Sequence, residues 1–386
     1  MKKVLIIHNK YQNIGGEDIA VSNEINFLKK SFQIDTIIFE NTISNKFKQI
    51  LSFILNNNKS SNKAIVNKIN EFKPDIVYIH NTWFKVSLGI FSILEKFDIP
   101  VYLKVHNFRY FCTRQLLSSK HFDDKEFCAG CGNYLKHKYL INRYYKDSFL
   151  KSLLVLRYGV KYYKILKNNK INILVLTEFH KKFMETLGIN QNKIKVFPNF
   201  TPNNSISSIL KKNQIIYAGR ISEEKGIEEV ILAFKKANIQ EINLLIVGDG
   251  PDKHTLKTKY ESKNIIFLGQ LDNKEVINLI SESLAVVTGT KLYEGQPTLL
   301  CEASMMSVPS FFPKSGGIEE FFPQNTMLSF QNKNYEELTD KFSLLEDLTL
   351  LKDEGIRNKK FINDYLNEEK LSNNFSNIIS GTNHGT

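Results

Sequence analysis

Two glutamates separated by seven residues, Glu294 and Glu302, lie where an apolar run at 284–288 gives way to a loop and then to a helical pattern. The run predicts a buried strand, and open α/β sheets bind ligands at the carboxyl ends of such strands. Both carboxylates can therefore face one ligand whose phosphates meet the N–H groups at the start of the helix. Because carboxylates accept hydrogen bonds from sugar and ribose hydroxyls, the pattern predicts a sugar-nucleotide site. Two unrelated surface glutamates would give the same spacing.

Two upstream strand ends carry groups that suit a diphosphate. Arg220 and Lys225 follow an apolar strand at 215–218 and precede a helix predicted over about 227–236. Arginine binds phosphate oxygens in a bidentate manner, and lysine adds a mobile point charge. The next strand, 243–247, ends in Gly248-Asp249-Gly250-Pro251, where a backbone without side chains can approach a ligand closely. A fourth strand, at 309–312, precedes Ser315-Gly316-Gly317-Ile318-Glu319.

The alternation of short apolar runs with helical patterns predicts an α/β protein with doubly wound sheets. A chain of 386 residues is too long for one ordinary domain and fits two of about 150 to 200 residues. The polar stretch 201–212 has the composition of a linker between them. In the first half, strands are predicted at 4–7, 36–39, 76–80, 101–105, 173–176 and 195–197.

Taken in order, these motifs resemble glycosyltransferase family 4, the retaining transferases of GT-B fold. The matching segments cover residues 1 to about 330 and are Gly15-Gly16-Glu17, Val105-His106-Asn107, Pro198-Asn199-Phe200, Gly219-Arg220, Lys225-Gly226, Gly248-Asp249-Gly250-Pro251, Glu294 with Glu302, and Gly316-Gly317. The resemblance implies two Rossmann-like doubly wound domains that face each other across a cleft. Residues 1–200 would form the acceptor-side domain and 201–349 the nucleotide-sugar domain, with the helical tail 350–386 packing back on the first.

The resemblance also implies roles for individual residues. His106, Glu294, Arg220 and Lys225 would be catalytic, with His106 positioning the donor sugar rather than acting as a base. The donor would be bound by Gly16, Gly219, Gly248, Gly250, Gln296, Pro297, Thr298, Leu299 and Glu302. Without the family, His106 at the end of a strand would be read as structural, and Gly15-Gly16 as an ordinary turn. The chain departs from the family at Glu294-Gly295-Gln296-Pro297, where many members carry Glu-Gly-Phe-Gly, so the donor sugar is not identified.

The expected reaction moves a hexose-type sugar from a nucleotide diphosphate sugar to a lipid-linked saccharide with retained anomeric configuration, in O-antigen or capsule assembly. A GT-B sugar-nucleotide epimerase would share the diphosphate contacts but would need acid/base groups on both faces of the sugar. A non-catalytic nucleotide-binding scaffold at the membrane is the other alternative. Intact Glu294, Glu302, Arg220 and Lys225 argue against the scaffold.

Three cysteines raise the question of a metal. Cys128 and Cys131 have the spacing of a zinc knuckle, and Cys112 would supply a third thiolate. A structural zinc site would still need a fourth ligand, so free or buried cysteines remain the alternative. No Asp-x-Asp motif follows a strand in the second half of the chain. The sequence therefore predicts catalysis without a cofactor, with Arg220, Lys225 and a helix N-terminus stabilising the leaving diphosphate.

The net charge of +12 is concentrated in one segment. Tyr134 to Lys170 contains ten lysines or arginines and one acid, Asp147, interleaved with aromatic residues. Such a stretch can rest on anionic lipid with its rings at the headgroups, or it can be a solvated helix face. No motif supports nucleic acid binding. Only four apolar residues separate Lys3 from His8, which argues against a signal peptide, so we expect a cytoplasmic protein, peripheral on the inner face of the membrane.

Overall fold

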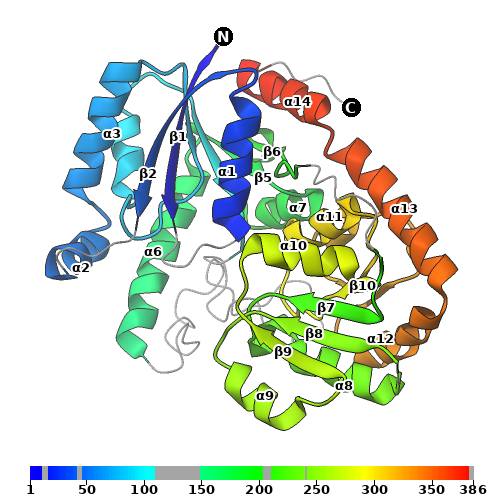
Figure 1. The fold of residues 1–386 in the computed structure, drawn as a ribbon. Helices are drawn as coiled ribbons and strands as arrows, with labels where there is room; N and C mark the ends of the chain where they lie inside the picture. Colours follow the sequence, from blue (N-terminus) through cyan, green and yellow to red (C-terminus); the bar gives the residue numbers. More distant parts are fainter. Residues whose placement is uncertain (11–15, 41–45, 109–147, 203–209, 240, 382–386) are drawn as a thin grey trace. The chain divides into compact units, whose positions relative to one another are not determined.

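The computed structural model describes residues 1–386 apart from 11–15, 41–45, 109–147, 203–209, 240 and 382–386 (Figure 1). The described residues divide into two compact units. The first unit contains the chain up to Phe200 together with the segment from Glu368 onward, and the second contains Thr201 to Asn367. Each unit is built on its own parallel sheet, so each is described by itself.

The sheet of the first unit has the strand order β2-β1-β3-β4-β5-β6, and every pair is parallel. The four residues from Val4 to Ile7 are fully buried, as expected for a strand that is covered on both faces. All six strands predicted in this half are confirmed, with ends that differ by up to three residues. The strands are β1 Lys3–Lys10, β2 Gln33–Glu40, β3 Ile76–Ile79, β4 Val101–Val105, β5 Ile171–Val175 and β6 Ile194–Val196.

Helices of the first unit include one from the far end of the chain. The ring of Phe375 on α14 contacts the rings of Phe32, Tyr78 and Phe197, and Lys2 Nζ donates to Ile379 O at 3.3 Å. These contacts hold α14 beside the N-terminal strand (Figure 1). The helical segments are α1 Gly16–Leu28, α2 Lys46–Leu55, α3 Lys59–Phe72, α4 Gly89–Leu94, α6 Phe149–Lys167, α7 Glu178–Thr186, the 3₁₀ turn Gln191–Lys193 and α14 Glu368–Ser380.

The sheet of the second unit has the order β12-β11-β10-β7-β8-β9, again all parallel. Four of its strands were predicted. The strands β9 and β12 were not predicted, and β12 is only three residues long. The strands are β7 Gln214–Ala218, β8 Asn243–Val247, β9 Ile265–Gly269, β10 Ala285–Val287, β11 Ser310–Lys314 and β12 Ser329–Gln331.

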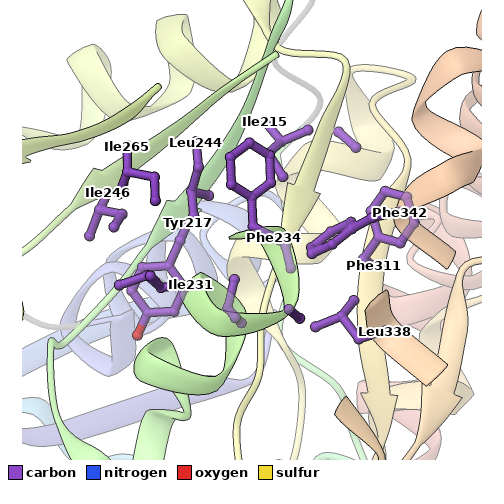
Figure 2. Packing of buried hydrophobic residues seen from close by; sticks show 14 of the residues in the cluster. Ile215, Tyr217, Ile231, Phe234, Leu244, Ile246, Ile265, Phe311, Leu338 and Phe342 are labelled. Carbon is purple, nitrogen blue, oxygen red and sulfur yellow. The ribbon is translucent and has the colours of Figure 1, made fainter. Parts of the chain in front are cut away.

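The core of the second unit lies between this sheet and the helices on one of its faces (Figure 2). Phe234 of α8, Phe311 of β11 and Phe342 form a group of aromatic rings with centroids 5.3 to 6.0 Å apart. Burying one such side chain contributes about 1.5–3 kcal/mol. The helical segments are α8 Ile227–Ala237, α9 Lys253–Tyr260, α10 Asn273–Glu282, α11 Thr298–Met305, α12 Tyr335–Lys341, α13 Leu348–Tyr365 and the 3₁₀ turns Glu223–Lys225, Ile318–Phe321 and Phe342–Glu346. The helix predicted over 227–236 is confirmed as α8.

The strand orders fix where each sheet can hold a ligand. In the first unit the order reverses between β1 and β3, and in the second between β7 and β10. Loops that leave the carboxyl ends of strands at such a reversal open a crevice for ligands. The C-terminal helices divide between the units, with α13 in the second and α14 in the first. Within the described ranges, no helix is both long enough and apolar enough to cross a bilayer.

Candidate functional site

The loops after β7 and β8 touch each other backbone to backbone. Gly219 N donates to Val247 O at 3.0 Å, and Ile221 N donates to Asp249 O at 2.9 Å. A Cβ atom on Gly248 would lie 1.9 Å from Gly219 O, and one on Gly250 would lie 2.1 Å from Ile221 O. Only glycine fits at these two positions, so Gly248 and Gly250 shape the turn next to Arg220.

A second pair of glycines brings Lys225 to the loop after β10. Gly226 has φ of 64°, and a Cβ atom there would lie 1.9 Å from Gly289 O. On Gly289, a Cβ atom would lie 2.6 Å from Gly226 O. The turn that carries Lys225 therefore packs directly on the segment leading to Glu294. Sequence reading gave Gly289 no role, although its place just after a predicted strand was a usable signal.

Glu294 and Lys225, 69 residues apart in sequence, form an ion pair. Lys225 Nζ donates to Glu294 Oε1 at 2.5 Å, and Thr290 Oγ1 donates to the same oxygen at 3.0 Å. Both charged side chains are about 30% exposed (31% and 26%), so a ligand can reach them. The backbone of Glu294 is held as well, because Gly317 N donates to Glu294 O at 2.8 Å. Lys225 and Glu294, which were predicted as parts of separate motifs, thus meet in one place.

Arg220 lies at the same end of the sheet. Its side chain is exposed and forms no ion pair with any residue the structure describes, while its carbonyl accepts a hydrogen bond from Tyr217 OH at 2.8 Å. Burial, together with the Glu294 and Glu224 carboxylates, raises the pKa of Tyr217, which keeps its phenol protonated as a donor. The guanidinium group is therefore available to an anion while its backbone is fixed.

Glu302 lies inside α11 and is half-buried. Burial raises the pKa of its carboxyl group from 4.5 to about 7. Across the described part of the chain, no side chain forms a hydrogen bond or ion pair with it. A desolvated carboxylate without a partner is destabilised until a ligand supplies donors.

The helix that carries Glu302 begins at the predicted donor segment. α11 starts at Thr298 after Pro297, and no side chain caps its first turn, so the N–H groups of that turn have no side-chain acceptor there. Thr298 and Leu299 are partly exposed. The Gln296 side chain is buried, with Nε2 3.5 Å from Thr201 Oγ1 and 3.9 Å from Cys301 Sγ. Gln296 therefore helps to hold the loop in place through its contacts with Thr201 and Cys301.

In the first unit, the predicted site residues follow β1 and β4, of which β1 borders the strand-order reversal. Gly16 is the first residue of α1, and His106 directly follows β4. His106 Nε2 lies 3.0 Å from His80 Nδ1, the first residue after β3. Sequence reading missed His80, although it ends a predicted strand beside the one that His106 follows. Gly15 and the cysteines Cys112, Cys128 and Cys131 lie outside the described residues.

The histidines are surrounded by groups that disfavour protonation. Burial comes first for both His80 and His106, and the ammonium group of Lys104 adds to it, so both pKa values lie well below 6.5. Among the residues described, no group of three or more His, Cys, Asp or Glu side chains has a geometry that could hold a metal ion. Cys301, the free cysteine within those ranges, is buried, and burial raises its thiol pKa.

Part of the chain is similar to known glycosyltransferases. Residues 201–374 match the family described as glycosyl transferases group 1. The protein named "putative teichuronic acid biosynthesis glycosyltransferase TuaC" of Bacillus subtilis is 30% identical to this chain over 146 residues. The match covers 38% of this chain and 36% of TuaC. The amylovoran biosynthesis glycosyltransferase AmsD of Erwinia amylovora is 26% identical over 171 residues, 42% of this chain and 48% of AmsD. The chain thus spans less than half the length of these curated relatives.

A solved structure supports the fold over the whole chain. HepE of Anabaena, crystallised with UDP and glucose, superposes with a TM-score of 0.67 at 15% identity and covers 99% of this chain and 100% of its own. Two parallel Rossmann-like sheets and this superposition confirm the predicted GT-B architecture. Residues 201–374, which carry Arg220, Lys225, Glu294 and Glu302, thus match the glycosyl transferases group 1 family, and the chain has the GT-B fold.

Proposed function

We propose that this protein is a retaining glycosyltransferase of family 4 that transfers a sugar from a nucleotide diphosphate sugar to a lipid-linked saccharide during bacterial surface-polysaccharide assembly. The observation that carries the proposal is the group at the β7/β10 reversal. There the Lys225–Glu294 pair lies at the same end of the sheet as the exposed arginine that follows β7, and among the described residues the half-buried carboxylate on α11 has no partner. The relatives TuaC and AmsD are named for polysaccharide biosynthesis, which supports the setting.

Each group has a role that follows from its chemistry. Arg220 and Lys225 bind the diphosphate and stabilise the charge that develops on it as the glycosidic bond breaks. The uncapped first turn of α11 adds N–H donors and the positive end of the helix dipole. Glu302 accepts hydrogen bonds from the ribose hydroxyls, and Glu294 contacts the transferred sugar. His106 of the first unit positions that sugar. HepE was crystallised with UDP, so we take a uridine nucleotide as the first donor to test.

Nucleotide binding is expected to depend on pH through Glu302. Its folded pKa of about 7 leaves the carboxyl mostly neutral at pH 6 and ionised at pH 8. An ionised carboxylate accepts stronger hydrogen bonds from hydroxyls than a neutral carboxyl group does. Calorimetric titration with UDP, GDP and dTDP should therefore identify one nucleotide whose affinity rises between pH 6 and pH 8. In Glu302→Gln that nucleotide should bind at least about ten-fold more weakly than in the parent at pH 8. Between pH 6 and pH 8, the affinity of this variant should rise only by the amount that ionisation of the nucleotide phosphate causes.

Controls separate this site from general effects. Lys257→Met, an exposed position on α9, should bind as the parent does. The bound nucleotide's sugar conjugates are then incubated with a lipid-linked saccharide, and the anomeric configuration of the product is read by NMR. Retention supports the proposal, whereas inversion, epimerised free donor without acceptor, or no nucleotide binding in the panel overturns it.

The acceptor side of the proposal includes contact with an anionic membrane. On α6, the exposed residues Leu150, Leu153, Arg157 and Lys164 lie along one stripe at spacings of three, four and seven residues, and the leucines are 66% and 40% exposed. For two aromatic residues the headgroup prediction is wrong, because Tyr158 and Tyr162 lie in the core, 1% and 5% exposed. The residues of the predicted basic segment at 134–147 lie outside the described residues. The hypothesis of membrane contact therefore depends on the stripe of leucines and cations and not on those two rings.

Charge reversal on the stripe tests membrane binding. Each cation near an anionic surface contributes about 1 kcal/mol, and salt screens this attraction. Arg157→Glu with Lys164→Glu should reduce binding to vesicles of anionic lipid by about ten-fold or more in a sedimentation assay. Leu150→Ser with Leu153→Ser should remove the part that persists at high salt. The matched control, Lys352→Glu with Lys360→Glu on α13, makes the same charge change at exposed positions and should bind as the parent does. Equal binding by all three double variants would remove the membrane from the proposal.

A further inference from the structure

The contact between His80 and His106 determines which ring nitrogens of the two histidines carry a proton. His80 Nδ1 and His106 Nε2 are 3.0 Å apart, and the two rings are nearly parallel, with an angle of 26° between their planes. Two neutral imidazole nitrogens at this distance share one proton, because one must donate and the other must accept. Which ring donates decides which nitrogen of His106 is left to face a ligand.

The surroundings of His80 select the donor. His80 is 4% exposed, and its Nε2 is buried with no hydrogen-bond partner in the described part of the chain. A buried N–H group without an acceptor costs about 1–3 kcal/mol, and such orphaned donors are rarer than under-satisfied acceptors. His80 therefore keeps its proton on Nδ1 and leaves the lone pair on Nε2. His106 Nε2 then accepts, and the proton of His106 sits on Nδ1.

His8 follows the same rule in the same cluster. Its Nε2 lies 2.8 Å from Asp18 Oδ1, and because the carboxylate can only accept, this nitrogen carries the proton. The other nitrogen, Nδ1, is buried without a partner among the described residues, as expected for a lone pair. In both rings the proton sits on the nitrogen that has a partner, which is the arrangement of lower free energy.

These proton positions hold for neutral rings, and the groups that face the two rings favour the neutral form. Burial lowers the pKa of His80 and of His106 well below 6.5. The charged or titratable groups that act on the two rings are Lys104 of β4, His8 of β1 and His180 of α7. Lys104 itself pairs at 2.5 Å with the fully buried Glu24 of α1. The carboxylate of Asp18 is engaged by His8, and that of Glu24 by Lys104. An imidazolium in this cluster would therefore face Lys104 without a carboxylate of its own.

We propose that His80 is a positioning residue that fixes the tautomer of His106, so that His106 presents an Nδ1–H donor. His106 is half-buried, whereas His80 is only 4% exposed. A single N–H donor with a fixed direction recognises a hydroxyl or ring oxygen of a sugar, whereas the opposite tautomer would offer only an acceptor there. This consequence rests on the proposed function, in which His106 positions the transferred sugar. The tautomer itself does not depend on that function.

The tautomer can be read directly by ¹⁵N NMR of the full chain labelled at histidine. The chain has eight histidines, so signals of His106 and His80 are assigned from the losses in His106→Gln and His80→Phe. At pH 7.5 the parent should show His106 protonated on Nδ1 and unprotonated on Nε2. A parent spectrum with the proton of His106 on Nε2 overturns the proposal, and this outcome requires no activity assay.

Two substitutions of His80 separate positioning from packing. His80→Asn keeps an N–H donor near the place of Nδ1 and should keep the His106 tautomer, whereas His80→Phe fills the space without a donor and should release it. With the proposed transfer as readout, His80→Phe should lower kcat about five- to ten-fold with little change in KM, and His80→Asn should restore most of it. His254→Asn, at an exposed position, is the control that should change neither readout.

The outcomes distinguish the inference from the function on which it draws. If the parent shows the Nδ1–H tautomer and His80→Phe loses it, the positioning role stands even where His106→Gln transfers sugar at the parent rate, and only the role of His106 in transfer fails. If His80→Phe retains the parent tautomer, some other group fixes His106 and the positioning role of His80 is wrong.

Discussion

Replacing Lys104 with methionine should lower the free energy of unfolding of the first unit by about 3–5 kcal/mol, because it leaves a buried carboxylate without its cation. Lys104 Nζ and Glu24 Oε2 are 2.5 Å apart, and both side chains are completely buried. Tyr78 OH donates to the other carboxylate oxygen at 2.5 Å, and the ammonium group lies over the Phe197 ring, 4.6 Å from its centroid. A methionine fills the space but supplies neither the charge nor the donor.

The measurement is urea unfolding followed by tryptophan fluorescence. Trp83, the single tryptophan of the chain, contacts Phe53 and Tyr158 in the first unit, so its signal reports that unit. The double variant Glu24→Gln/Lys104→Met removes both charges and should recover much of the loss. Lys212→Met, which breaks an exposed pair with Glu282, should cost less than about 1 kcal/mol. A Lys104→Met variant as stable as the parent would mean that the buried pair contributes nothing.

The strands of both sheets could largely be predicted, because strands buried on both faces appear as apolar runs that need no knowledge of distant residues. Val4 to Ile7 and Asn243 to Val247 are examples. β12 was missed because Phe330 is the single apolar residue among Ser329 to Gln331, which is too few to form a pattern. The prediction also failed for Tyr158 and Tyr162, since a basic, aromatic sequence does not reveal which rings face the core.

The candidate site was predicted residue by residue but not as a set of contacts. Glu294 and Lys225 were found from their places after strands, yet their ion pair depends on the close approach of Gly226 and Gly289, which spacing does not encode. The buried pair of Glu24 and Lys104 was not predicted, because an apolar strand with one lysine is compatible with a lysine that reaches solvent. Each missed feature is a contact between segments far apart in the chain, and sequence periodicity contains only local information.

Removing the cation of Lys225 should have a large effect on transfer. Lys225→Met should lower kcat/KM about ten-fold or more, because a charge-assisted hydrogen bond contributes about 1.5–3 kcal/mol and the diphosphate gains charge as the sugar leaves. Arg220→Gln should have an effect of similar size. The assay is steady-state transfer with the nucleotide sugar identified by calorimetry, and Lys257→Met on α9 serves as the exposed control.

Variants of Glu294 distinguish two possible reasons for the loss of transfer in Lys225→Met. In the free protein, Lys225 donates to Glu294 Oε1, so the two side chains hold each other in place. If Lys225 serves only to orient Glu294, Glu294→Gln and Lys225→Met should each weaken transfer, and the double variant should be no worse than either single variant.

If Lys225 binds the diphosphate directly, Lys225→Met should also weaken binding of the bare nucleoside diphosphate, whereas Glu294→Gln should leave that binding nearly intact while slowing transfer. We expect the second pattern, because an ion pair about 30% exposed on both sides opens to a phosphate at little cost. Unchanged kinetics in Lys225→Met and Arg220→Gln together would remove the diphosphate from this end of the sheet.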